Sequence, residues 1–311
     1  MFLGRNKSKT IGSGLHPNLF ILGVAKSATT TLADALRQHP EIFITAQKEP
    51  TFFSSDEEFS KGIGWYTSNY FKKSYGYKFR GEASPSYLYF GEKVAKRIKE
   101  NIPDPTIRFI VIFRNPIDRA YSHYWHNVLR GLKETLSFMD ALSAEESRLE
   151  QNMIEYQNKG RIRYAYYSAG LYANQLEIFW KYFPKESFIL LLQEDLYKDN
   201  FSKTISAIQA KLELDIVPAE YQHSNYSYRI INRSLDHAIR KKTFIKELIK
   251  RWIPPDRRFR MKSSLLKLTA RDESYPPMDP DIRKMLIDRY IDSIVEFEKI
   301  IGRDLSNWYK Q

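Results

Sequence analysis

Residues 18–32 read NLFILGVAKSATTTL, an apolar run followed by a loop of small and hydroxyl-bearing residues. The run at residues 18–22 predicts a buried strand that ends at Gly23. Apolar residues within positions 29–38 share one helical face, and His39-Pro40 ends that pattern. The stretch therefore predicts a strand, a turn and a helix in direct succession.

The turn between this strand and this helix has the chemistry of an anion site. Backbone N–H groups at a helix N-terminus point ahead of the helix, and the helix dipole favours negative charge there. A lysine adds positive charge and hydroxyl groups add donors, as in a P-loop. The candidate phosphate-binding residues are Lys26, Ser27, Ala28, Thr29, Thr30 and Thr31. No second glycine precedes Lys26, so the loop is not a Walker A sequence, and a plain turn before a threonine-capped helix explains it equally well.

The remaining periodic segments predict the fold class. Apolar runs predict strands at residues 41–45, 107–113 and 188–192, and helical patterns cover residues 116–129, 172–183 and 281–301. Strands that alternate with helices imply a central parallel sheet covered on both faces, which is an α/β fold. We expect a flexible tail at residues 1–16 and one domain at residues 17–311, with irregular segments at 54–80 and 222–275.

A second candidate anion site follows the strongest strand signal. Arg114 ends the run at residues 107–113, Asn115 and Pro116 begin the next helix, and Ser122 lies eight residues after the arginine. The carboxyl ends of parallel strands face the ligand crevice, where an arginine can bind a phosphate with two hydrogen bonds. Taken singly, a surface ion pair explains Arg114 and an ordinary helix position explains Ser122.

Composition narrows the function without selecting it. The 311 residues carry a net charge of +12, which favours anionic partners but also suits a generally basic surface. The absence of cysteine excludes disulfides, zinc-thiolate sites and cysteine nucleophiles, and no cluster of metal ligands stands out. No signal peptide, transmembrane stretch or nucleic-acid-reading motif is recognisable, so we expect a cytoplasmic protein that does not bind nucleic acid.

Several ordered motifs together resemble the PAPS-dependent sulfotransferase family, where PAPS is 3′-phosphoadenosine 5′-phosphosulfate. Residues 26–32 resemble its 5′-phosphosulfate loop, and residues 114–124 (RNPIDRAYSHY) resemble its 3′-phosphate motif. Residues 48–53 (KEPTFF) and 81–88 (GEASPSYL) are similar to two further segments of the branch that contains the heparan sulfate sulfotransferases and their bacterial relatives. The resemblance covers roughly residues 17–308, and a bacterial-type member is the better analogy.

The resemblance implies a P-loop nucleotide-kinase-like domain and specific residue roles. Lys26 would contact the bridging oxygen and sulfonate of PAPS, and residues 27–31 would hold the 5′-phosphate. Arg114 and Ser122 would bind the 3′-phosphate, and Glu49 matches the catalytic base. Arg271 and Tyr275 align loosely with the late nucleotide loop. The family needs no metal, releases PAP, and transfers sulfonate to a hydroxyl or amine of an acceptor such as a glycan or another small or lipid-linked molecule.

Two departures and two alternatives stay open. Ala28 stands where the family commonly has glycine, and Ala83 stands where the heparan branch has a lysine. A P-loop kinase that uses ATP and Mg²⁺ is one alternative, against which stand the missing Walker A pattern and the lack of an acid after residues 107–113. A non-catalytic protein that binds a nucleotide or an anionic glycan is the other. His123 and His126 are read either as structural residues or as contacts to the acceptor.

Overall fold

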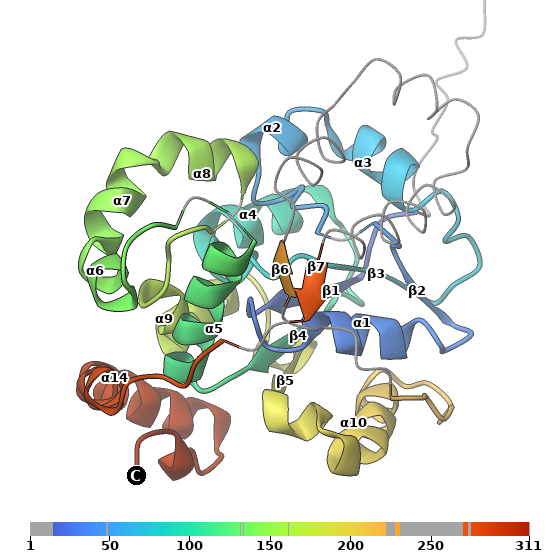
Figure 1. Ribbon diagram of the computed structural model, residues 1–311. Coiled ribbons are helices and arrows are strands. Elements are labelled where there is room, and N and C mark those ends of the chain that lie inside the picture. Colours follow the sequence, from blue (N-terminus) through green and yellow to red (C-terminus); the bar gives the residue numbers. More distant parts are fainter. Residues whose placement is uncertain are drawn as a thin grey trace, which may run out of the picture.

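The computed structural model describes residues 15–47, 49–130, 132, 134–160, 162–221, 228–230, 270–272 and 275–310. Its centre is a five-stranded sheet in the order β2-β3-β1-β4-β5, and every neighbouring pair is parallel (Figure 1). The strands are β1 (Leu19–Gly23), β2 (Ile42–Ile44), β3 (Phe79–Ala83), β4 (Arg108–Phe113) and β5 (Phe188–Leu192). The predicted α/β class with a central parallel sheet is confirmed.

Helices surround this sheet. They are α1 (Thr29–Leu36), α2 (Asp56–Phe59), α3 (Ile63–Tyr70), α4 (Gly91–Asn101), α5 (Pro116–Leu129), α6 (Phe138–Ser143), α7 (Glu145–Gln151), α8 (Met153–Lys159), α9 (Tyr172–Trp180), α10 (Lys198–Lys211) and α14 (Pro280–Ile301). Short 3₁₀ turns lie at residues 168–170, 185–187, 193–196 and 306–308. A separate antiparallel pair joins β6 (Tyr228–Ile230) to β7 (Ala270–Asp272).

The side chains of β1 point alternately into two hydrophobic cores, one on each face of the sheet. Phe20 and Leu22 belong to one buried cluster, which also holds apolar residues of α3, α4, α5, α9 and α14. Leu19 and Ile21 belong to a second cluster, which is covered by α1 and α10 (Figure 1). Because successive strand side chains point to opposite faces, a strand buried on both faces is apolar at every position, as residues 19–22 are.

The predicted strands and helices are found within a few residues of their expected bounds. The helix predicted at residues 29–38 ends at Leu36, and the one predicted at 172–183 ends at Trp180. Asn115 caps α5 as expected, because its side chain accepts a 3.0 Å hydrogen bond from the N–H of Ile117. The expected tail at residues 1–16 lies outside the described residues, except for Leu15 and His16.

The prediction of an irregular segment at residues 54–80 is wrong. It contains α2, α3 and the start of β3, a strand that the sequence pattern did not indicate although it lies between β2 and β1. The reason is Gly81, where an added Cβ would lie 2.6 Å from Ile44 Cδ1 and 3.0 Å from the carbonyl oxygen of Leu19. Close packing there requires a small residue, so β3 lacks the β-branched run that marks a buried strand. Most of residues 222–275 lies outside the described residues.

Candidate active site

The loop between β1 and α1 is a tight turn at the carboxyl edge of the sheet. The N–H of Val24 donates to Ile112 of β4 over 2.9 Å, and the N–H of Ser27 donates back to Val24 over 3.2 Å. Lys26 and Ala28 have φ values of 78° and 60°, in the left-handed region that favours glycine. Each such residue costs about 1–2 kcal/mol. The position where the family commonly has glycine is left-handed in this chain, which occupies it with alanine.

The N-terminus of α1 and the residue before its N-cap present hydrogen-bond donors toward the carboxyl edge of the sheet. Ala28 is its N-cap and makes no side-chain bond, so the alternative of a threonine-capped helix is wrong. Ser27 is fully buried, and its Oγ has no hydrogen-bond partner among the described residues. A buried hydroxyl without a partner costs about 1–3 kcal/mol. An anion in front of α1 would accept from Ser27 and from the free N–H groups of the first turn, so the loop fits a phosphate.

Lys26 lies in a cluster of positive charge. Its Nζ is 3.4 Å from Nδ1 of His126 on α5. Burial, together with the charges of Arg114 and Arg130, lowers the pKa of Lys26 to about 8, and the charge of Glu49 opposes this shift. Lys26 is therefore still protonated at neutral pH. A nearby anion would stabilise this charged form.

His126 is the acceptor for this ammonium. Burial, Lys26 and Arg130 lower the pKa of His126 to about 3, so its ring is neutral and Nδ1 is free to accept. His123, one turn earlier, is buried against the ring of Tyr166, and burial also lowers its pKa. The sequence left both histidines open, either as structural residues or as contacts to an acceptor, and did not indicate a bond to Lys26. The partner of His126 comes from a loop 100 residues away, and no local pattern indicates it.

Arg114 joins the two predicted anion sites. Its guanidinium donates a 3.0 Å hydrogen bond to the carbonyl oxygen of Lys26, and its own carbonyl accepts one of 2.8 Å from the hydroxyl of Tyr172. Arg114 thus braces the phosphate loop from the end of β4. Ser122 is buried two turns further along α5.

A pocket of about 310 Å³ opens beside Arg114. It is lined by Arg114, Asp118, Tyr121, Tyr275, Pro276, Pro277, Met278 and Arg283. The ring of Tyr275 is parallel to that of Trp125 at 6.1 Å and meets Tyr121 edge-on at 5.6 Å. Tyr275 therefore lines the same pocket as Arg114. Arg271 lies in β7, where its backbone pairs with Arg229, and its side chain is outside the described residues.

Glu49 lies on the other side of the loop. It is exposed, has a φ of 49°, and lines a small cavity with Thr29 and Thr30 of α1 and with Ala83 at the end of β3. Its charge reaches Lys26, because it acts on the pKa of that lysine. The sequence also allows Glu49 to be a surface carboxylate paired with Lys48, and Lys48 is outside the described residues.

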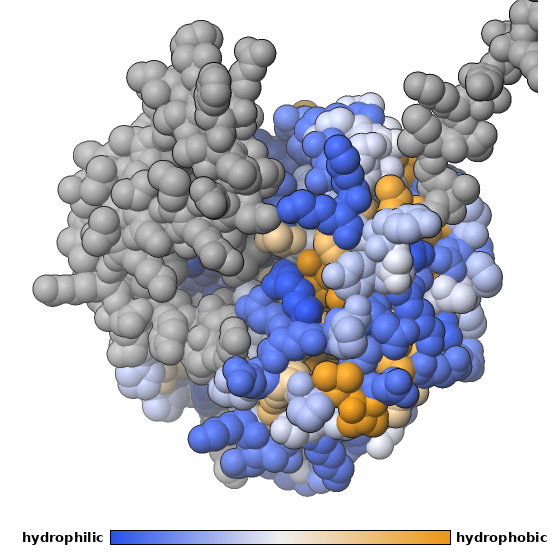
Figure 2. Space-filling view, turned by 90° about the vertical axis from the view of Figure 1, so that its right-hand side faces the viewer, coloured by the Kyte–Doolittle hydropathy of each residue, from blue (hydrophilic) through white to orange (hydrophobic). Residues whose placement is uncertain are grey.

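The coloured part of the face in Figure 2 is mostly hydrophilic, with smaller apolar groups among the hydrophilic ones. Among the described residues, no helix is both long and apolar enough to cross a bilayer. Nor do three or more His, Asp or Glu side chains of the described part gather where they could hold a metal ion.

A parallel α/β sheet with a lysine-containing loop between β1 and α1 at its carboxyl edge is a P-loop-like fold. A family model described as a sulfotransferase domain matches residues 16–254. The chain belongs to the sulfotransferase family, which is a family of enzymes.

Individual relatives agree with this family. Heparan sulfate glucosamine 3-O-sulfotransferase 5 of Mus musculus is 34% identical over 172 residues, which are 55% of this chain and 46% of that protein. Bifunctional heparan sulfate N-deacetylase/N-sulfotransferase 3 of Homo sapiens is 27% identical over 305 residues, 95% of this chain and 31% of that protein. The chain therefore spans less than half the length of these relatives. The crystal structure of a sulfotransferase from Alicyclobacillus acidocaldarius superposes with a TM-score of 0.67 at 26% identity, over 94% of this chain and 98% of that one.

Proposed function

We propose that the protein transfers a sulfonate group from PAPS to a hydroxyl or amine of an acceptor and releases PAP. The observation that carries this proposal is the convergence at one loop of Lys26, the guanidinium of Arg114 and the hydroxyl of Ser27, which has no partner among the described residues. PAPS has two phosphate groups and a sulfonate, so it carries more negative charge than a single phosphate. Lys26 and Arg114 supply two cations to bind it, and Ser27 supplies a hydroxyl donor.

The donor would be held by two groups of residues. Ser27, Ala28, Thr29, Thr30 and Thr31 would bind the 5′-phosphate through hydroxyl and backbone N–H donors at the start of α1. Arg114 and Ser122 would bind the 3′-phosphate, and Tyr275 would line the nucleotide pocket next to Arg114. Arg271 is assigned to the same nucleotide through the family resemblance.

Lys26 would be the main electrostatic catalyst. As the acceptor atom bonds to sulfur, the bond from sulfur to the bridging oxygen breaks and negative charge grows on that oxygen. An ammonium fixed beside the oxygen stabilises the transition state more than the ground state. The neutral ring of His126, 3.4 Å from Nζ, holds the lysine without competing as an anion would.

Glu49 would take the proton of the attacking hydroxyl or amine. A positioned carboxylate contributes about 10²–10⁴-fold to such a step. Glu49 is exposed beside the start of α1, where an acceptor can reach it from solvent. The relatives whose names specify heparan sulfate favour a glycan acceptor, while Ala83 supplies no second cation at the reaction centre.

The direct test is transfer from radiolabelled PAPS to a panel of glycans, phenols and amines. We expect labelled product and an equal amount of PAP with at least one acceptor, and a loss of at least about 100-fold in kcat for Glu49→Gln. Exposed Glu57→Gln in α2 is the matched control and should keep its rate. Phosphoryl transfer from ATP with Mg²⁺, without sulfonate transfer, would contradict the proposal.

A further inference from the structure

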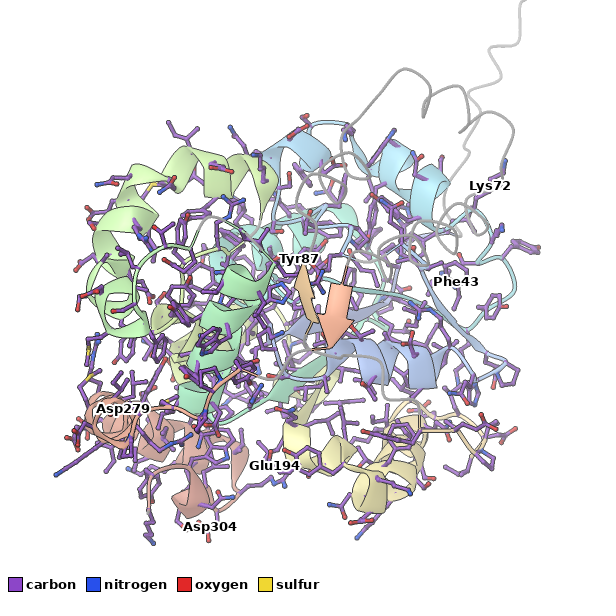
Figure 3. All side chains as sticks on the ribbon, viewed as in Figure 1. Phe43, Lys72, Tyr87, Glu194, Asp279 and Asp304 are labelled. Atoms are coloured by element: carbon purple, nitrogen blue, oxygen red, sulfur yellow. The ribbon has the colours of Figure 1, made fainter. Side chains whose placement is uncertain are left out.

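A fully buried carboxylate lies under the segment that carries Glu49. Glu82, on strand β3 between β1 and β2, has no solvent exposure. Its Oε1 accepts hydrogen bonds from the hydroxyls of Tyr66 (2.5 Å) and Tyr87 (2.7 Å), and its Oε2 accepts one from Ser84 (2.7 Å). Figure 3 places Tyr87 in the interior of the molecule. Burying an acidic group is costly unless it is hydrogen-bonded, and here three hydroxyls donate to it.

Two of these hydroxyls also accept hydrogen bonds from the backbone of residues 49–53. Ser84 directs its hydrogen to Glu82, so its oxygen accepts a 3.1 Å bond from the N–H of Thr51. Tyr87 does the same, because its oxygen accepts a 3.1 Å bond from the N–H of Phe53. The carboxylate thereby fixes the direction of both hydroxyls, and each hydroxyl fixes one N–H of the segment. We call Glu82, Ser84 and Tyr87 the relay.

The segment needs such support. Glu49 and Thr51 have φ values of 49° and 53°, and each left-handed residue costs about 1–2 kcal/mol. Strained residues persist where the surrounding structure over-determines them, and they concentrate at active sites. The N–H of Thr51, one of the two strained residues, is bound by the relay. Phe52 stacks on Tyr66 with a centroid distance of 4.2 Å, and this stacking also holds the segment in place.

We propose that Glu82 is a positioning residue for Glu49, acting through Ser84 and Tyr87 on the strained turn at residues 49–51. The proposal rests on the proposed function of Glu49 as the base. The relay sets where the Glu49 carboxylate points relative to Lys26 and the acceptor, and it touches neither donor nor acceptor.

A matched pair of variants tests the relay. Tyr87→Phe and Tyr66→Phe each remove one hydroxyl that donates to Oε1 of Glu82, and both residues are fully buried, but only Tyr87 also binds the backbone of the segment. We expect kcat to fall about 10-fold or more in Tyr87→Phe, as for other misplaced catalytic groups, and several times less in Tyr66→Phe. PAP affinity, measured by calorimetry, should stay unchanged in both. Equal losses of kcat that follow the melting temperatures of the two variants would overturn the proposal.

A double-mutant cycle separates this proposal from the base assignment. If Tyr87 acts through Glu49, the variant Glu49→Gln/Tyr87→Phe will be no slower than Glu49→Gln alone. Losses that multiply would overturn the relay while leaving Glu49 as the base. A Glu49→Gln variant with wild-type kcat would instead remove the base assignment from the proposed function, and the relay with it.

Discussion

The guanidinium of Arg114, at the end of β4, donates a 3.0 Å hydrogen bond to the carbonyl oxygen of Lys26 in the loop between β1 and α1. This single bond connects two motifs that lie 88 residues apart. The conformation of the phosphate loop therefore depends on Arg114, the cation at the end of β4. A change at Arg114 should therefore affect donor binding both directly and through the loop.

The charge of Lys26 predicts the alkaline side of the pH profile. With a pKa of about 8 in the donor-free protein, Lys26 loses its proton as the pH rises above that value. Because kcat/KM reports the ionisation of the free enzyme, kcat/KM for PAPS should fall above about pH 8. The charge of Arg130 lowers this pKa, so Arg130→Met should move the fall to higher pH.

The control for this profile is Lys310→Met, which removes an exposed cation at the other end of the chain. Lys310→Met should leave unchanged the pH above which kcat/KM falls. An identical profile for wild type and Arg130→Met would contradict the charge cluster around Lys26.

The neutral histidines of α5 predict sensitivity to acid. Burial and nearby cations lower the pKa of His126 to about 3 and that of His123 well below its usual 6.5. Below pH 6.5 the unfolded chain therefore binds protons that the folded chain does not, and the free energy of unfolding decreases as the pH falls. Each histidine contributes up to about 1.4 kcal/mol for each pH unit.

Urea unfolding of His126→Gln at pH 7.5 and pH 5 measures this contribution. The variant should lose less stability between the two values than the wild type, by roughly 1–2 kcal/mol. The variant for comparison is His39→Gln. His39 is also buried, but its ring bonds to the backbone carbonyl of Asp215 and not to a lysine. An unchanged pH dependence in His126→Gln would show that His126 is charged or exposed in solution.

The conformation of Ala28 predicts an unusual response to glycine. Ala28 has a φ of 60°, so Ala28→Gly relieves about 1 kcal/mol of left-handed strain, which offsets the extra freedom of the unfolded chain. Ala25→Gly, three residues earlier in the same loop, has only the unfavourable effect. Thermal unfolding should therefore show a lower melting temperature for Ala25→Gly and an equal or higher one for Ala28→Gly. Equal destabilisation by both would contradict the left-handed conformation.

The sequence was most informative where a feature is local. The loop at residues 23–32 follows a strand that is apolar at every position, and Arg114 ends the strongest strand in the chain, so both could be placed at the carboxyl edge of a parallel sheet from the residues alone. Strand β3 escaped prediction because its residues are matched to distant neighbours: Gly81 packs closely against Ile44 and Leu19, and Glu82 accepts hydrogen bonds from Tyr66 and Tyr87.

The same limit applies to the site. His126 bonds to a lysine 100 residues earlier, and the backbone of residues 51–53 is held by side chains from residues 84 and 87. Such partners follow from the packing of distant elements and leave no periodic or compositional signal in the chain.

Calorimetric titration with PAP tests the central claim most directly. We expect wild type to bind PAP, ATP with Mg²⁺ to bind at least about 10-fold more weakly, and Arg114→Ala to lose about 10- to 100-fold in PAP affinity, as for a charged hydrogen bond. Arg108→Ala, at the opposite end of the same strand β4, should bind PAP as wild type does. Absence of PAP binding, or equal binding of ATP with Mg²⁺, would contradict the account.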